Sequence, residues 1–157
     1  MLTVVMVVEG VLRLPQSEAM LVTGKGLFAA LAPTTRLYLL SYAWTESELQ
    51  SWLARNQLTG HLGIITASGP TPQQRLDALR RIRSWRVELV IEPDPQCAAL
   101  EIAEGWTALL HAPALYAEPA WRPDHTGHIR PWQALTDEMQ HQENLRLREN
   151  RARTTPE

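Results

Sequence analysis

Polar side chains stand directly after several apolar stretches that are typical of buried strands. The first is Glu9, which follows the run Leu2 to Val8 and precedes Gly10. Ligands of open parallel sheets bind beyond the carboxyl ends of the strands, so such residues are candidates for one shared site. An acidic residue and a glycine after a buried strand are a common beginning of a phosphate-transfer site. The later members of the set are Ser41, Thr71, Glu92 and Asp94.

The elements that must position these residues alternate along the chain. Short β-branched or apolar runs predict strands, and segments with apolar residues three and four apart predict helices. This alternation from residue 2 to about 112 predicts an α/β domain with a parallel sheet covered on both faces. The expected strands are 2–8, 36–43, 62–67, 87–92 and 107–112, and the expected helices are 26–32, 45–60, 72–85 and 95–105.

Local signals support two of these helices. Thr45 and Glu48 have the spacing of a capping box, in which each side chain satisfies a free backbone N–H at the helix start. Gly105 is the usual residue type where a helix ends in a left-handed cap. Cys97 is the only cysteine and excludes an intrachain disulfide, and a small buried core residue is its expected role.

The stretch LRLPQSEAMLVTGKG, residues 12–26, consists of two short alternating pieces around a polar middle. It predicts a hairpin or flap after the first strand, although Pro15 weakens the first arm. VTGKG, residues 22–26, resembles a fragment of a phosphate-binding loop but lacks the full spacing, so a turn of the flap is the expected structure.

Composition changes after Pro113. Residues 113–131 are rich in proline and aromatic residues and predict an extended arm, and a polar helix is expected from about Pro131. Trp121 and Trp132 are candidate contact anchors, because indoles bury much area and keep a polar group. His125 and His128 could hold a metal with a nearby aspartate, but their proline-bounded stretch favours a solvated loop. The expected partner of 113–157 is another protein, a second copy or the chain's own core.

The global composition narrows the function classes. The length of 157 residues argues for one domain. The formal net charge of −2 argues against strong nucleic-acid binding. The longest apolar run, Leu2 to Val8, is too short to span a bilayer and lacks the flanks of a signal peptide. A cytoplasmic location without membrane association is therefore expected. Among the charged residues, Arg80 and Arg81 are expected to lie on a solvated helix face.

The ordered set of strand-end motifs resembles the haloacid dehalogenase (HAD) superfamily of phosphatases. VVEGVL lies over that family's Asp-x-Asp-Gly motif, and LYLLS ends in Ser41 at the second motif. PTPQQRLDALRRI lies over the third motif and LVIEPDPQCAALEIAEG over the fourth. The resemblance covers about residues 2–112 and is nearest to the 3′-phosphatase domains of polynucleotide kinases and to small bacteriophage proteins. It implies a HAD-like Rossmannoid domain over 1–112, with a flap hairpin and a C-terminal segment 113–157.

The departures from the family pattern decide what the resemblance implies for activity. The aspartyl nucleophile aligns with Val7, which has no atom able to attack phosphorus. The acid/base aligns with Glu9, whose longer side chain moves the carboxylate. The cationic residue of the family aligns with Thr71, and Arg75 lies one helical turn later. The metal-binding carboxylates align with Glu92 and Pro93, and Asp94 lies next to them.

The sequence thus predicts a catalytically inactive HAD-like domain with a binding or assembly role and no cofactor. Two alternatives stay open. One is an atypical Mg²⁺-dependent phosphatase that acts through Glu9, Ser41 or Glu92. The other is a protein that binds a phosphate or a nucleic-acid end through Ser41, Arg75 and backbone N–H groups.

Overall fold

The computed structural model of the chain describes residues 1–15, 17–111, 139–141 and 144. The chain divides into two compact units, Met1–Pro113 and Ala114–Glu157. In the second unit the described residues are helical. The expected arm, its anchors Trp121 and Trp132, and the histidines His125 and His128 lie outside the described residues. No helix in the described ranges is both long and apolar enough to cross a bilayer.

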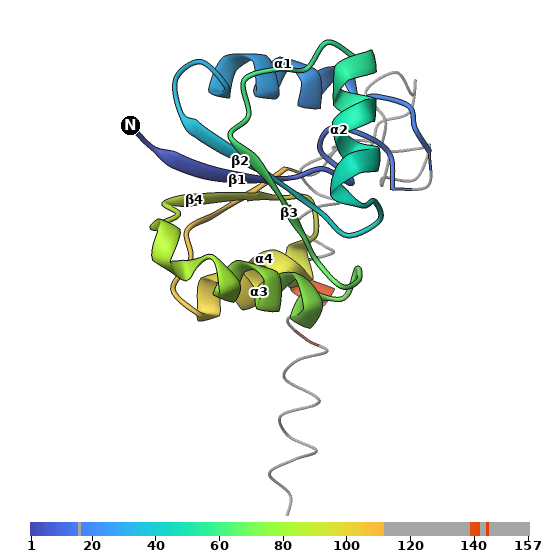
Figure 1. Ribbon diagram of the computed structural model, residues 1–157. Coiled ribbons are helices and arrows are strands. Elements are labelled where there is room, and N and C mark those ends of the chain that lie inside the picture. Colours follow the sequence, from blue (N-terminus) through green and yellow to red (C-terminus); the bar gives the residue numbers. More distant parts are fainter. Residues whose placement is uncertain (16, 112–138, 142–143, 145–157) are drawn as a thin grey trace, which may run out of the picture. The chain divides into compact units, whose positions relative to one another are not determined.

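The first unit is built on a five-stranded parallel sheet, as the alternating pattern predicts (Figure 1). The strand order is β3-β2-β1-β4-β5, so the chain adds strands on one side of β1 and then returns to its other side. β1 is therefore the central strand, with Val4 paired to Leu37 on one edge and to Leu89 on the other. The strands are β1 (Thr3–Val7), β2 (Arg36–Ser41), β3 (Gly63–Thr66), β4 (Leu89–Glu92) and β5 (Ala108–Leu110).

Helices cover both faces of this sheet, with α1 and α2 on one side and α3 and α4 on the other (Figure 1). The residues of β1 alternate between the two faces, as strand geometry requires. Val4 and Met6 belong to the core cluster that contains the buried residues of α1 and α2, and Val5 and Val7 belong to the cluster that contains those of α3. The helices are α1 (Val22–Leu31), α2 (Glu46–Arg55), α3 (Pro72–Arg81), the 3₁₀ turn η1 (Arg83–Trp85) and α4 (Pro95–Ala103).

The helix ends follow the local signals in the sequence. Thr45 and Glu48 form the expected capping box at the start of α2. Thr71 and Gln74 form a second one at the start of α3, which the sequence interpretation did not identify. Gly105 has a φ of 92°, the left-handed conformation expected after α4.

The segment after β1 differs from the prediction in its second half. It turns back on itself, since the N–H of Leu21 donates to the carbonyl of Leu12 at 2.8 Å. The expected flap turn at residues 22–26 is wrong, because these residues form the first turns of α1. The physical reason lies at Gly24, where a Cβ atom would stand 1.7 Å from the carbonyl oxygen of Val11. Glycine here permits close packing of a helix on the preceding loop rather than a turn.

Trp52, Trp85 and Trp106 fit helix faces or strand starts in the sequence, which predicts core positions for all three, and the structure confirms this for Trp52. Trp52 is buried, at 2% exposure. Trp106 is half-buried, and Trp85 is 44% exposed, so the core placement of Trp85 is wrong. Trp85 instead stacks on Tyr38 with a ring-centroid distance of 4.8 Å, because η1 lies beyond the end of the apolar face of α3.

Candidate functional site

The candidate site lies at the carboxyl edge of the sheet, where the strand order reverses between β1 and β4. This position is the usual ligand crevice of a doubly wound sheet. Glu9 follows β1 by two residues, Ser41 is the last residue of β2, and Glu92 is the last residue of β4. All three are buried, with exposures of 1%, 0% and 0%. The edge therefore carries buried polar groups, which must find partners inside the protein.

Glu9 is bound by the end of β2 and the loop that follows it. The hydroxyl of Ser41 donates to Glu9 Oε1 at 2.5 Å, and the N–H of Ala43 donates to the same oxygen at 3.1 Å. The N–H of Tyr42 donates to Oε2 at 3.4 Å. The sequence placed Glu9 and Ser41 in one site, and the structure brings them into direct contact.

An arginine that the sequence interpretation did not identify completes the surroundings of Glu9. The Arg13 guanidinium lies 3.6 Å from Glu9 Oε1, and its side chain is 4% exposed. Its planar head stacks on Trp44, 3.7 Å from the ring centroid, and it donates to the carbonyl of Ser17 at 2.9 Å. The charge of Glu9 is thus balanced by a cation of the same loop.

A second ion pair occupies the end of β4. Arg75 of α3 binds the Oε1 atom of Glu92, and the N–H of Asp94 donates to the same oxygen at 3.0 Å. The Arg75 guanidinium lies 4.9 Å from the ring centroid of Tyr42. Burial alone would lower the pKa of Arg75, but the negative charge of Glu92 raises it above its ordinary value. Arg75 and Glu92 are therefore fixed as a buried charged pair.

Glu101 of α4 brings a second carboxyl group to this pair. It is 1% exposed, and its Oε2 atom, like that of Glu92, has no hydrogen-bond partner among the described residues. Burial and the charge of Glu92 raise the pKa of Glu101 to about 9, and burial also raises the pKa of Glu92. Two carboxyl groups in one buried site do not both ionise near neutral pH, so Glu101 carries the proton. The arrangement is an Arg75⁺–Glu92⁻ pair with a neutral acid beside it.

The other predicted site residues have structural roles in the described chain. Val7 is 1% exposed and packs in the apolar cluster on the α3 side of the sheet. Thr71 accepts from the N–H of Gln74 at 3.3 Å as the cap of α3, and Asp94 accepts from the N–H of Gln96 at 2.8 Å as the cap of α4. Neither capping side chain contacts Glu9 in the described structure.

Cys97 is buried in α4, at 1% exposure, as expected for a core thiol. Burial and the nearby Glu92 raise the pKa of this thiol. A thiol whose ionisation is suppressed is a poor nucleophile. Cys97 therefore has a packing role beside the Glu92 cluster.

Two residues of the site, Arg13 and Glu101, escaped the sequence interpretation, although both have a recognisable spacing. Arg13 stands four residues after Glu9, and the two form an ion pair. Glu101 stands four residues after Cys97, on the buried face of α4. A charged residue on an otherwise buried helix face indicates a buried partner.

The chemistry available at this edge follows from these contacts. A general base or nucleophile needs a free lone pair directed at the reacting atom. Here Glu9 accepts three hydrogen bonds from the β2 end, and Glu92 is bound to Arg75. No group of three or more His, Cys, Asp or Glu side chains in the described ranges is arranged to hold a metal ion. The site is a set of internally balanced charges.

No family model, no curated protein and no solved structure matches this chain.

Proposed function

We propose that the chain is a catalytically inactive HAD-like protein with a binding or assembly role. The observation that carries the proposal is the state of the charged residues at the carboxyl edge of the sheet. Both carboxylates at that edge are bound by an arginine of the same unit. A site whose charges are already balanced has no charge left for a substrate or an ion.

The position of the nucleophile supports the loss of phosphatase chemistry. In the HAD alignment this position is Val7, and its side chain packs among apolar residues rather than at a polar surface. Glu9, at the acid/base position, is hydrogen-bonded to Ser41. Ser41, which matches the second motif of the family, is thus bound to a partner inside the protein.

The residues at the edge do not fit the Mg²⁺ ion that the HAD resemblance implies. Mg²⁺ is bound through one or two well-placed carboxylates in near-octahedral geometry. Val7 supplies no oxygen, and Arg75 is bound to the Oε1 atom of Glu92. A guanidinium so placed excludes a divalent cation by charge and by volume.

The binding role rests on the second unit of the chain. Ala114–Glu157 is the second of the chain's two units, and its sequence carries Trp121 and Trp132 among proline-rich residues. Such indoles are typical anchors of protein interfaces. We infer a protein partner, or a second copy of the chain, for this unit. The resemblance to small bacteriophage HAD-like proteins further supports a bacteriophage gene as the source of the chain and the host cytoplasm as its location.

A phosphatase assay tests the loss of activity. Wild-type protein and Glu9→Gln are incubated with p-nitrophenyl phosphate and with a 3′-phosphorylated oligonucleotide in Mg²⁺. The expected result is no turnover above the buffer rate for either protein. Turnover by the wild type that disappears in Glu9→Gln would establish the atypical enzyme instead, and binding of the oligonucleotide without turnover would favour the phosphate-binding alternative.

A sizing measurement tests the assembly role independently. Light scattering of the full chain is compared with that of a Trp121→Ala, Trp132→Ala variant, with Trp85→Ala as the matched control at an exposed tryptophan of the first unit. We expect the double variant to lose an association that the control keeps. Identical masses for all three proteins, together with identical partners in a pull-down, would refute the role of these anchors.

A further inference from the structure

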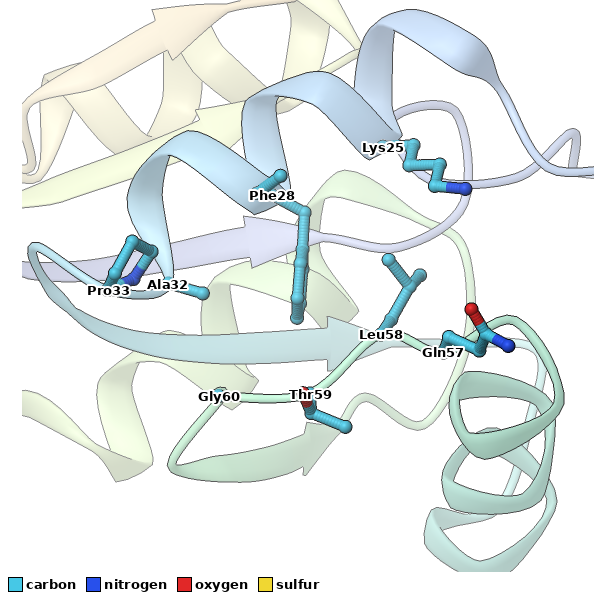
Figure 2. Close-up of a pocket in the computed structure, with 9 residues that line it drawn as sticks. Lys25, Phe28, Ala32, Pro33, Gln57, Leu58, Thr59 and Gly60 are labelled. Atoms are coloured by element: carbon cyan, nitrogen blue, oxygen red, sulfur yellow. The ribbon is translucent and has the colours of Figure 1, made fainter.

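A groove lies between α1 and the connection from α2 to β3, apart from the candidate site. Its volume is about 270 Å³. Figure 2 shows Lys25 and Gln57 at one end, Ala32 and Pro33 at the other, and Phe28 and Leu58 between them. Phe28 and Leu58 between these ends are apolar, and the polar side chains of the lining are Lys25, Gln57 and Thr59. The groove thus has an apolar body and a polar, cationic end.

Its floor is fixed by the core of the domain. Phe28 is 2% exposed and Leu58 is 5% exposed. The ring of His61 packs on Phe28 with a centroid distance of 6.3 Å. Because these side chains belong to the core or pack on it, the groove is largely formed before any ligand arrives, as small-molecule sites usually are.

The backbone at the polar end has a conformation that favours glycine. Gln57 has a φ of 58° and directly follows Asn56, the C-cap residue of α2. The N–H of Leu58 donates to the carbonyl of Leu53 at 2.9 Å, which completes a helix cap of the Schellman type. A glycine would adopt this conformation at no steric cost. The chain instead places a side-chain amide there, beside the groove.

The charge of the lining selects the ligand. Lys25 is the single lysine of the chain, and no acidic side chain among the described residues lines the groove. A bound carboxylate would therefore meet an ammonium group and the Gln57 amide at one end and apolar surface along its tail.

We propose that this groove is a binding site for small monocarboxylates with an apolar body. The carboxylate lies toward Lys25 and Gln57, and the apolar body lies against Ala29, Ala32 and Pro33, over the buried Phe28 and Leu58. For a ligand of this size in an open groove, the dissociation constant is expected to be on the order of 1 mM. The proposal is independent of the role of the strand-end site.

An NMR titration of the full-length ¹⁵N-labelled protein with hexanoate tests the proposal. We expect saturable amide shifts concentrated in residues 25–33 and 57–60. Hexylammonium, which has the same tail and the opposite charge, is expected to give no saturable shift there. Lys25→Gln should weaken hexanoate binding about fivefold, whereas Arg83→Gln, the loss of an exposed charge on η1, should leave it unchanged.

A second variant tests the apolar body of the groove separately from its cationic end. Ala29 lines the groove from an exposed position of α1, so Ala29→Trp should fill the groove without disturbing the core. We expect it to abolish saturable hexanoate shifts while its spectrum stays dispersed. Shifts centred elsewhere, equal binding of hexylammonium, or no saturable shift up to about 20 times the expected dissociation constant would overturn the proposal.

Discussion

Glu101 of α4 and Glu92 at the end of β4 are buried carboxyl groups whose charges interact, beside the guanidinium of Arg75. Each carboxyl group has one oxygen, Oε2, that finds no donor among the described residues. A proton held by Glu101 supplies the missing donor. Two interacting buried acids therefore favour one neutral carboxyl group, which makes the folded state sensitive to pH.

The first prediction concerns that sensitivity. The pKa of Glu101 rises from 4.5 to about 9 on folding, chiefly through burial. Between these pH values the folded protein binds a proton that the unfolded chain has lost, so the free energy of unfolding falls as pH rises. We expect Glu101→Gln, which is neutral at every pH, to be more stable than wild type by about 2 kcal/mol at pH 8.

Urea denaturation between pH 5 and 9 measures this effect. The control is Glu104→Gln, because Glu104 is held ionised by its hydrogen bonds to Arg80, which lower its pKa. That variant should keep the pH slope of the wild type, since Glu104 is ionised in both states across this range. A wild-type stability that does not change over the range would contradict the shared proton.

The second prediction concerns the Arg75–Glu92 pair. Removing one partner leaves the other charge buried and unpaired, which costs about 3 to 5 kcal/mol in typical proteins. We expect Arg75→Met and Glu92→Gln each to lower the free energy of unfolding by such an amount. The double variant should lose less than the sum, and a double-mutant cycle should give a coupling energy of at least about 2 kcal/mol. Additive losses would mean that the pair is not formed in solution.

The third prediction concerns Val7. Its side chain lies in the apolar cluster with Leu40 and Leu79, so Val7→Asp places a carboxylate where it has no partner among the described residues. We expect a loss of about 4 kcal/mol at pH 7, compared with about 2 kcal/mol for the control Val7→Ala. Lowering the pH to 4 should narrow the difference between the two variants, because a neutral carboxyl group is cheaper to bury. Equal stability of Val7→Asp and wild type would show that position 7 is exposed.

The fourth prediction uses two glycines of α1. A Cβ atom at Gly24 would stand 1.7 Å from the carbonyl oxygen of Val11, whereas a Cβ atom at Gly26 would meet nothing within 4 Å. Gly24→Ala should therefore displace the helix and cost about 3 kcal/mol or more. Gly26→Ala should stabilise the protein by about 0.5 to 1 kcal/mol through helix propensity. Thermal denaturation of the two variants measures both, and effects of the same sign would contradict the packing at Gly24.

Features encoded over a few residues could be predicted from the sequence. The alternation of runs gives the parallel α/β sheet, and the spacing of Thr45 and Glu48 gives the start of α2. The placement of Glu9 beside Ser41 also followed, because the carboxyl ends of neighbouring parallel strands meet at one edge. These signals depend on geometry that any chain with the same local pattern shares.

The remaining features depend on contacts between distant residues. VTGKG has the composition of a turn, yet it begins α1, and its Gly24 packs closely on Val11 of the preceding loop. Glutamate usually lies on the surface of a helix, so the residue type of Glu101 does not indicate burial. Its burial goes with the position of Glu92, which lies nine residues earlier in the chain but on a different element. A single sequence does not encode such pairings in its local pattern.

The position of β1 in the centre of the sheet has a consequence for synthesis of the chain on the ribosome. β2 and β3 complete one side of β1 early, but its other edge pairs only with β4, whose first paired residue is Leu89. At about 5 to 20 residues per second, the nascent chain carries an apolar strand with an open edge for several seconds. Such an edge is a template for pairing with another chain. Slow translation between residues 67 and 88 would lengthen the exposure, so the yield of native protein depends on how fast this middle segment is made.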